Sequence, residues 1–203
     1  SYIEIPEIHS PRASFPCYLY SMLNVLADII PVKKGDINES ISMLTSTKKK
    51  ISSTNLTDSN PALSLSKWVS EIPIIYYPWG LHSAAIRFKN SLQENAKTHA
   101  FVEDVIESSH NAIVAWQKRS KIKPILIIGK DDYVKTKERW KILKEFFELN
   151  KIQYKEIHST NGSILTKLVN LIYLLDYGSI YRAILTKTDP TPVKPIEFIK
   201  NRI

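Results

Sequence analysis

Two polar pairs stand at the ends of successive predicted elements, and both carry groups that can move protons. Glu94 and Asn95 close a helical stretch, and His110 and Asn111 follow sixteen residues later, where a further helix opens. Carboxylate and imidazole groups are frequent general acids and bases. The spacing alone leaves two interpretations open, a catalytic pair or a solvated helix-end glutamate with a capping histidine.

The predicted surroundings of Glu94 and His110 suit proton transfer. Glu94 lies near the C-terminal end of the predicted helix 82–96, where the helix dipole disfavours a carboxylate charge and so favours proton uptake. His110 opens a helix after a strand, a place where ligands are bound in α/β folds. Asn95 and Asn111 would support the site by hydrogen bonding or would serve as N-cap and turn residues.

The elements around these pairs alternate between strand and helix. "IPIIYY" (72–77) and "KPILIIG" (123–129) are typical of buried strands, and 99–105 and 152–158 are further strands. The predicted helices cover residues 17–30, 36–51, 61–70, 82–96, 111–116, 134–149, 164–176 (or to about 184) and 195–202. This alternation predicts an α/β fold, a three-layer αβα sandwich with a mainly parallel sheet. Ligands of such sheets bind at the carboxyl ends of the strands.

The first third of the chain is predicted to lead into this sheet. Helix 17–30 is apolar on most sides and suits a buried position, and Asp36 is a plausible N-cap for helix 36–51. Pro61 fits the first turn of the next helix. We therefore expect residues 1–60 to form a connecting segment with helices, and residues 61–203 to form the α/β domain.

The distribution of basic residues favours a solvated surface over a nucleic-acid site. The 203 residues carry a formal net charge of +8, which leaves a nucleic-acid partner as one interpretation. Its basic groups are spread over Lys48–Lys50, Lys118–Lys123 and Lys135–Lys144, and the last alternates with glutamates at helical spacing. The first two clusters contain no aromatic residue, so a solvated surface is favoured and no nucleic-acid partner is predicted.

The sequence lacks the residue patterns that several classes of protein require. Cys17 is the single cysteine, which excludes an internal disulfide and favours a cytoplasmic setting. The five glycines lie at least sixteen residues apart, unlike the clustered glycines of dinucleotide and ATP sites, and the histidines lack metal-binding spacing. No apolar run approaches 18 residues. The sequence therefore predicts no cofactor, no metal and no membrane partner.

Four stretches resemble one enzyme family. "QENAKTHAFVEDVIESSHNAIVAW" (93–116) resembles E-N-[AS]-K, an apolar strand and P-E-x-x-H-N-E-[IV], a pattern of bifunctional phosphoglucose/phosphomannose isomerases of archaeal and bacterial type. "SPRASF" (10–15), residues 161–185 and "DPTPVKPIEFIKNRI" (189–203) are similar to other parts of the C-terminal half of these enzymes. The resemblance implies a flavodoxin-like sugar-isomerase (SIS) domain.

The sequence departs from the family at three places. Ile106 and Ala112 replace the proline and the second glutamate of the histidine block, and residues 33–60 are longer and more basic than expected. The N-terminal SIS domain of the family, with its phosphate-binding loop, has no counterpart in these residues. The resemblance therefore implies either that this chain is the C-terminal half of such an enzyme, with an N-terminal SIS domain as its partner, or that the protein is a truncated relative; the first is favoured.

The resemblance also implies a reaction and roles. The reaction is aldose–ketose isomerisation of phosphorylated hexoses, converting glucose 6-phosphate, and mannose 6-phosphate as a second substrate, into fructose 6-phosphate through a cis-enediolate. Glu94 corresponds to the base and Arg12 to the arginine that stabilises the enediolate. His110 and Lys200 correspond to the ring-opening groups, with Lys194 as the alternative lysine.

Asn95 and Asn111 correspond to substrate-site supports. Family members are cytoplasmic homodimers with shared active sites in glycolysis and gluconeogenesis, and the isolated chain is expected to fold without activity. The alternative is a phosphosugar-binding SIS module without catalysis.

Two further expectations concern packing. Helix 164–184 carries more apolar residues than one face can hide, so it should meet a second SIS half or a second subunit. Ile196 and Ile199 should anchor the closing helix to the domain.

Overall fold

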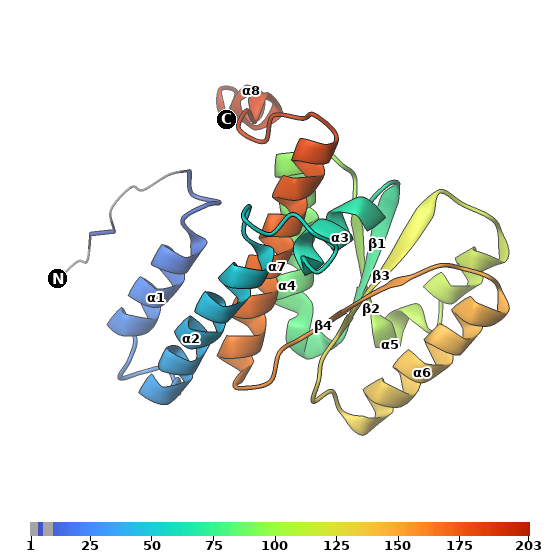
Figure 1. Ribbon diagram of the computed structural model, residues 1–203, viewed down its shortest axis with the longest axis horizontal. Coiled ribbons are helices and arrows are strands. Elements are labelled where there is room, and N and C mark those ends of the chain that lie inside the picture. Colours follow the sequence, from blue (N-terminus) through green and yellow to red (C-terminus); the bar gives the residue numbers. More distant parts are fainter. Residues whose placement is uncertain (1–3, 6–9) are drawn as a thin grey trace.

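The fold is a parallel sheet between two layers of helices (Figure 1). The structure is a computed structural model that describes residues 4–5 and 10–203; residues 1–3 and 6–9 of the predicted connecting segment lie outside the described residues. The four strands run parallel in the order β2-β1-β3-β4. They are β1 (Ile72–Tyr77), β2 (Phe101–Asp104), β3 (Ile122–Ile128) and β4 (Lys155–His158). The predicted three-layer α/β architecture is confirmed.

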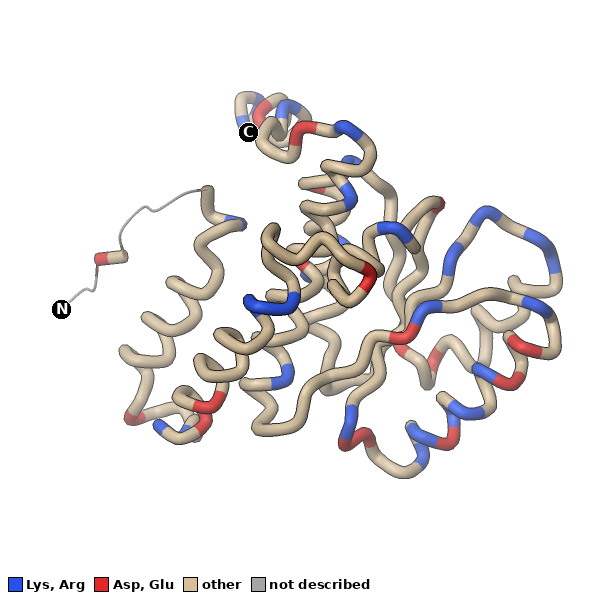
Figure 2. The backbone as a smooth tube through the Cα atoms, in the orientation of Figure 1, with Lys and Arg blue, Asp and Glu red and all other residues tan. Residues whose placement is uncertain are grey.

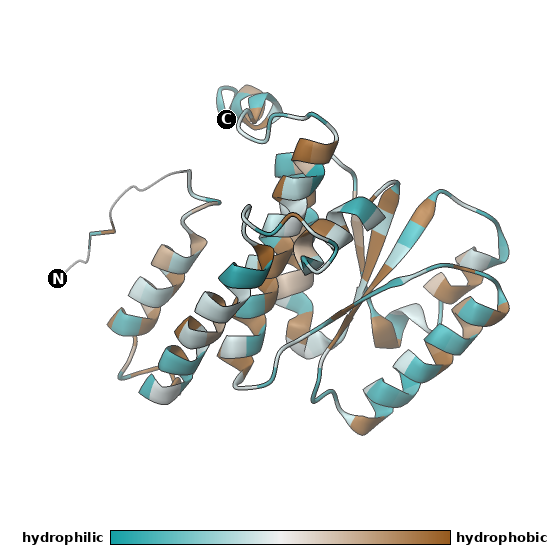
Figure 3. Cartoon of the chain, in the orientation of Figure 1, coloured by the Kyte–Doolittle hydropathy of each residue, from teal (hydrophilic) through white to brown (hydrophobic). Residues whose placement is uncertain are grey.

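Successive strand residues face opposite layers, which gives the domain two apolar cores. Ile75 and Ile127 pack with α4 (His82–Ala96) and α7 (Ile164–Leu185). Tyr76 packs on the other face with α6 (Val134–Leu149). Figure 3 shows much brown on the central strands β1 and β3 and mostly teal on α6, as expected when a helix buries one stripe and solvates the rest.

The remaining helices lie around these layers. They are α1 (Phe15–Val25), α2 (Lys34–Ile51), α3 (Pro61–Trp68), the short 3₁₀ helix η1 (Trp79–Leu81), α5 (Val105–Ser108), the 3₁₀ helix η2 (Ala112–Gln117) and α8 (Lys194–Lys200). Helices α2, α3 and α4 pack against α7, and α5 lies against α6. Charged residues are distributed over the surface, and both signs alternate along α6 (Figure 2).

Local sequence signals explain the start of α3. Pro61 stands in the first turn, as predicted, and the Asn60 side chain accepts hydrogen bonds from the amides of Ala62 and Leu63 at 3.0 Å. Asn60 therefore satisfies two amides that have no partner within the helix.

Four local predictions were wrong. Leu23 is the only buried residue of α1, so that helix is not buried. Asp36 does not cap α2, because it stands three residues after the N-cap Lys33 and accepts a hydrogen bond from its amide at 3.2 Å. Residues 111–116 do not open an α-helix, because Asn111 is the N-cap of the 3₁₀ helix η2. Ile196 and Ile199 remain 39% and 58% exposed, so they do not anchor α8.

Helix α7 is the central helix of its layer. Its 22 residues reach a mean hydropathy of 1.2, which by length and composition alone would suffice to cross a membrane. Half of that apolar stretch is buried within the domain, where α7 contacts three neighbouring helices. Its interior also contains Asp176, which is paired with an arginine. Such burial and pairing are typical of a core helix of a globular domain, and the outward residues Ile164 and Ile184 remain exposed.

Candidate active site

The topology places the two predicted proton-transfer groups at opposite edges of the sheet. Helix α4 connects the carboxyl end of β1 to the amino end of the parallel strand β2, so its last turn, with Glu94, lies at the amino edge. His110 follows the carboxyl end of β2. The four residues of β2 alone span about 13 Å at roughly 3.3 Å per residue. One chain therefore does not bring Glu94 and His110 together.

Arg12 joins Glu94 at the amino edge. Its Nη1 lies 3.7 Å from Glu94 Oε2 and donates a 3.4 Å hydrogen bond to the Glu94 carbonyl. Its Nη2 donates to the Thr191 carbonyl at 2.7 Å. The Arg12 and Glu94 side chains are 23% and 38% exposed, so the pair is partly shielded and still reachable from solvent. The structure thus brings together the predicted base and the predicted enediolate-stabilising arginine.

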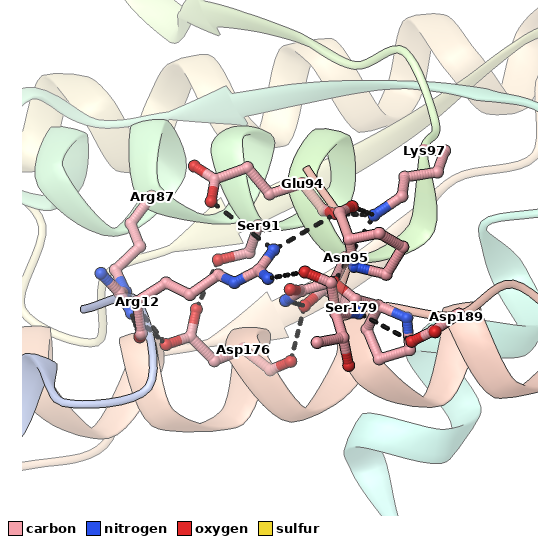
Figure 4. Close-up of polar contacts among 12 residues, drawn as sticks. Arg12, Arg87, Ser91, Glu94, Asn95, Lys97, Asp176, Ser179 and Asp189 are labelled. Atoms are coloured by element: carbon pink, nitrogen blue, oxygen red, sulfur yellow. Dashed lines mark hydrogen bonds and ion pairs between the residues drawn. The ribbon is translucent and has the colours of Figure 1, made fainter. Parts of the chain in front are cut away.

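A second arginine, Arg87, lies beside Arg12 and binds its backbone (Figure 4). Arg87 Nη2 donates to the Arg12 carbonyl at 2.7 Å, and Arg87 Nε and Nη2 both donate to Asp176 Oδ2 at 2.9 and 2.8 Å. Ser91 donates to the other Asp176 oxygen at 2.7 Å. The Arg87 guanidinium also lies 4.5 Å from the Phe15 ring centre. This network fixes the backbone that carries Arg12.

Asp176 is a partly buried carboxylate with a shifted pKa. Loss of solvent raises the pKa of Asp176, while the hydrogen bonds and charge of Arg87 act in the opposite direction. Sequence reasoning missed Asp176 and Arg87. A lone carboxylate inside the apolar run of 164–176 was the available signal, because a buried carboxylate requires a paired charge.

Two cavities meet at this cluster. One, of about 340 Å³, runs along α4 and is lined by Arg12, His82, Ser83, Ile86, Arg87, Asn90, Ser91 and Glu94. The second, of about 470 Å³, is mainly apolar and lies between the start of α1 and helix α7. Arg12, Arg87 and Ser91 line both cavities. The first cavity presents a carboxylate, two guanidinium groups and several hydroxyl or amide groups, a set suited to a polar, anionic ligand.

Lys97 also belongs to the amino edge and was missed. It ends α4 in a left-handed conformation, with φ 53°. Its Nζ donates to the carbonyls of Glu94 and, at 2.9 Å, of Pro192. Burial lowers the pKa of Lys97, and the nearby Arg12 charge acts in the same direction. Its place in "ENAK" was visible in the sequence, but the contact with residues near 190 was not.

The other residues that the sequence predicted for the site do not line the cavity beside Glu94. Asn95 is buried and donates to Ser179 Oγ at 2.8 Å, which links α4 to α7. Asn111 caps η2 and donates to Glu107 at 2.9 Å. His110 is exposed at the carboxyl edge. Lys194 and Lys200 are exposed on α8, which follows the segment held by Lys97.

The carboxyl edge, where a ligand was expected, carries carboxylates. A cavity of about 270 Å³ there is lined in part by Trp79, Asp131, Asp132 and Lys167. Lys167 donates to Asp131 at 2.6 Å, and this hydrogen bond lowers the pKa of Asp131. Asp132 accepts from the Gly129 amide and from Trp140 Nε1, both at 2.9 Å. An anion placed there would meet two carboxylates, which disfavours phosphate. Within the described part of the chain, no three histidine, cysteine or acidic residues are grouped to hold a metal.

Solved structures resemble this fold. A glucose-6-phosphate isomerase like protein from Thermus thermophilus superposes with a TM-score of 0.72 at 16% identity, covering 90% of this chain and 60% of that chain. Tagatose-6-phosphate ketose/aldose isomerase from Escherichia coli superposes with a TM-score of 0.63 at 12% identity, covering 88% of this chain and 51% of that chain. At these identities the likeness establishes the fold, and the predicted SIS type is confirmed.

Curated sequences and a family model match as well. A bifunctional phosphoglucose/phosphomannose isomerase from Caldicellulosiruptor bescii is 30% identical over 99% of this chain and 62% of its own length. One from Aquifex aeolicus is 28% identical over 98% of this chain and 60% of its own length. The chain thus spans about three fifths of these relatives. The model described as "Bacterial phospho-glucose isomerase C-terminal SIS domain" matches residues 58–203.

Proposed function

The chain belongs to the family of bacterial phospho-glucose isomerase C-terminal SIS domains, and we propose that it supplies the base and the ring-opening groups of an aldose–ketose isomerase for phosphorylated hexoses. The names of its curated relatives support glucose 6-phosphate and mannose 6-phosphate as substrates. Fructose 6-phosphate is then the common product. The proposal rests on the arrangement of Glu94 and Arg12 beside one cavity.

Glu94 acts as the base in this proposal. Its carboxylate takes the proton from C2 of the open-chain aldose. The electron pair of that C–H bond forms the C1–C2 double bond of a cis-enediolate, while the π electron pair of the C1 carbonyl moves onto O1. The same carboxylate returns the proton to C1 while the hydroxyl proton passes from O2 to O1. Glu94 suits this role because it borders the cavity and, among the described residues, no hydrogen bond is donated to its carboxylate.

Arg12 stabilises the negative charge that forms on the enediolate oxygens. A guanidinium presents fixed donors in a plane and stays protonated, so it can be in place before the charge develops. Its Nη1 lies 3.7 Å from Glu94 Oε2, so the same substrate can reach both side chains. The Arg87–Asp176–Ser91 network supports Arg12 through its backbone carbonyl.

His110 reaches the substrate from a second copy of the chain. It lies at the carboxyl edge of the sheet and Glu94 at the amino edge, so a homodimer in which the carboxyl edge of one copy meets the amino edge of the other completes the site. Trp79 at that carboxyl edge is 78% exposed, as expected for an aromatic residue at an interface. His110 and Lys200 then open the sugar ring, with Lys194 as the alternative to Lys200.

The phosphate group is bound by an N-terminal SIS domain. The acidic carboxyl edge of this domain supports that assignment, because Asp131 and Asp132 oppose an anion there. The outward apolar residues of α7 offer a surface for the second domain or subunit. The assembled isomerase is therefore this chain together with an N-terminal SIS domain, as a dimer, and the isolated 203-residue chain should fold without turning over substrate.

The test is Glu94→Gln in the assembled isomerase. Glutamine keeps the size of the side chain and loses the proton acceptor, so turnover should fall by roughly 10²–10⁴ with the KM little changed. Glu71→Gln is the matched control, because Glu71 is an exposed glutamate at the same edge, before β1. Near-normal turnover of Glu94→Gln would remove Glu94 from the mechanism. Substrate binding by the unmodified enzyme with no turnover would favour the alternative, a phosphosugar-binding SIS module.

A further inference from the structure

Helix α8 carries Lys200 but has no apolar anchor of its own. None of its described residues is buried, and its largest apolar side chains, Phe198 and Ile199, are more than half exposed. A single lysine contributes to a reaction only when it is held in place. The residues that determine the position of α8 must therefore lie before it, in the segment 189–193 that connects it to α7.

That segment is held by two cations of the amino edge. Lys97 Nζ donates to the Pro192 carbonyl at 2.9 Å and reaches the Pro190 carbonyl at 3.5 Å. Between them, the Thr191 carbonyl accepts a 2.7 Å hydrogen bond from Arg12 Nη2. The three successive carbonyls of residues 190–192 thus face two side chains that also contact the Glu94 backbone (Figure 4).

The composition of the segment makes it a good partner for cations. Pro190 and Pro192 have no amide N–H. The Thr191 amide donates to Asp189 Oδ1 at 2.8 Å. The backbone of 190–192 therefore has only acceptors left to offer. The ammonium of Lys97, with three donors, can bind several of them at once.

The side-chain contacts of Lys97 distinguish it from the other lysines with the same backbone conformation. Lys97 has φ 53°, a left-handed conformation in which glycine is the usual residue at a helix end. Among the described non-glycine residues, Lys151 and Lys187 share this feature, with φ 56° and 54°. They differ in their side chains, because neither ammonium makes a hydrogen bond or ion pair with the described residues. A glycine at 97 would relieve the backbone but would lose the contacts with 190–192.

We propose that Lys97 is a positioning residue that clamps the segment 189–193 to the end of α4 and thereby determines where α8 and Lys200 lie relative to Glu94. The positioning role rests on the proposed isomerase function, whereas the clamp itself does not. One ammonium bonds both the Glu94 carbonyl and the Pro192 carbonyl, so the turn that carries the base and the segment that carries the ring-opening lysine are held in a fixed relation.

The clamp is tested on this chain alone by hydrogen–deuterium exchange. In Lys97→Met the amides of residues 191–201 should exchange at least about tenfold faster than in the parent chain, because local opening becomes easier. Lys97→Arg keeps a cation with several donors and should retain most of the protection. Lys151→Met is the matched control, since it alters an equally left-handed lysine without these contacts, and it should leave residues 191–201 unchanged.

The positioning role is tested by a double-mutant cycle in the assembled isomerase. Lys97→Met should lower turnover of cyclic substrate with the KM little changed, and Lys97→Arg should restore part of it. Because Lys97 acts through Lys200, adding Lys97→Met to Lys200→Met should cause no further loss, and the effect should shrink with open-chain substrate. The loss caused by Lys194→Met should add to that of Lys97→Met, because the two residues are not coupled. If instead Lys194→Met is coupled to Lys97→Met and Lys200→Met is not, Lys194 is the residue that the clamp positions.

The two experiments fail in distinguishable ways. Unchanged exchange of residues 191–201 in Lys97→Met overturns the clamp, whatever the activity. Faster exchange together with additive losses in the double mutant, or equal losses on cyclic and open-chain substrate, overturns the positioning role while the clamp stands. Near-normal turnover of Glu94→Gln would overturn the proposed function and is measured independently of both, so failure of the proposed function is recognised separately.

Discussion

The two edges of the sheet carry similar charged residues in different arrangements. At the carboxyl edge, Asp131 bonds Lys167 at 2.6 Å, and Asp132 accepts from the Gly129 amide and Trp140. At the amino edge, the charged contact of the Glu94 carboxylate is the guanidinium of Arg12, 3.7 Å away. A carboxylate that already accepts hydrogen bonds from neighbouring groups stabilises the local structure. A carboxylate that borders a cavity and contacts its cation only at 3.7 Å can still accept a proton.

His110 and Glu94 also lie at different edges of the sheet. In a parallel sheet the C-terminal end of a connecting helix lies at the amino edge, and the loop after the next strand lies at the carboxyl edge. Glu94 and His110, sixteen positions apart in sequence, therefore lie at opposite edges. A site that uses both residues requires two chains. In the proposed mechanism the two edges are complementary, because one supplies Glu94 with Arg12 and the other supplies His110.

The contrast is tested most strongly by removing a cation from each edge. Arg12→Met should lower turnover of the assembled isomerase by about 10²–10³, the loss expected when one stabiliser of a developing negative charge is removed. Lys167→Met, at the carboxyl edge, should leave turnover nearly unchanged. Steady-state kinetics on both variants decides the matter. An equal loss in the two variants would mean that the edges do not differ in function.

The smallest effect on turnover is expected from a carboxylate that caps a helix. Glu39 accepts hydrogen bonds from the Ser163 amide and the Thr166 hydroxyl at the start of α7, and the Ser163 hydrogen bond is the main reason that the pKa of Glu39 lies below its ordinary value of 4.5. Glu39→Gln removes the charge and keeps an acceptor. Turnover should be unchanged.

Stability should respond instead, with a defined pH dependence. A carboxylate whose pKa is lowered by folding stabilises the folded state above its ordinary pKa, and this contribution disappears as the pH falls through the lowered value. Thermal unfolding should therefore show the parent chain to be more stable than Glu39→Gln at neutral pH, and the difference should vanish well below pH 4.5. A difference that persists in acid would mean that the charge of Glu39 is not the cause.

Sequence patterns predicted the central elements well, because strands and helices there follow their own apolar periodicity. Helices 82–96 and 134–149 and strand 72–77 have the predicted bounds. Predictions failed where position depends on other parts of the chain. Helices α1 and α8 carry apolar residues that the described domain does not cover, so their composition overstated their burial.

The candidate site was predicted only in part for the same reason. Arg12 and Glu94 were singled out by family resemblance, and the fold brings them together. Asp176 and Lys97 make contacts with residues about 90 positions away, which no local pattern reveals. The distance between Glu94 and His110 was also hidden, because spacing along the chain does not tell which edge of a sheet a residue occupies.

The central claim, a site shared between two copies, is tested most directly by complementation. Glu94→Gln and His110→Gln variants of the assembled isomerase should each be nearly inactive alone. In a mixed dimer, one site contains both substitutions and the other contains none. A randomly exchanged equal mixture should therefore recover about a quarter of the parent turnover, since half of the dimers are mixed and each has one intact site. If the mixture stays as inactive as the separate variants although subunits have exchanged, Glu94 and His110 do not act across the dimer and the account is wrong.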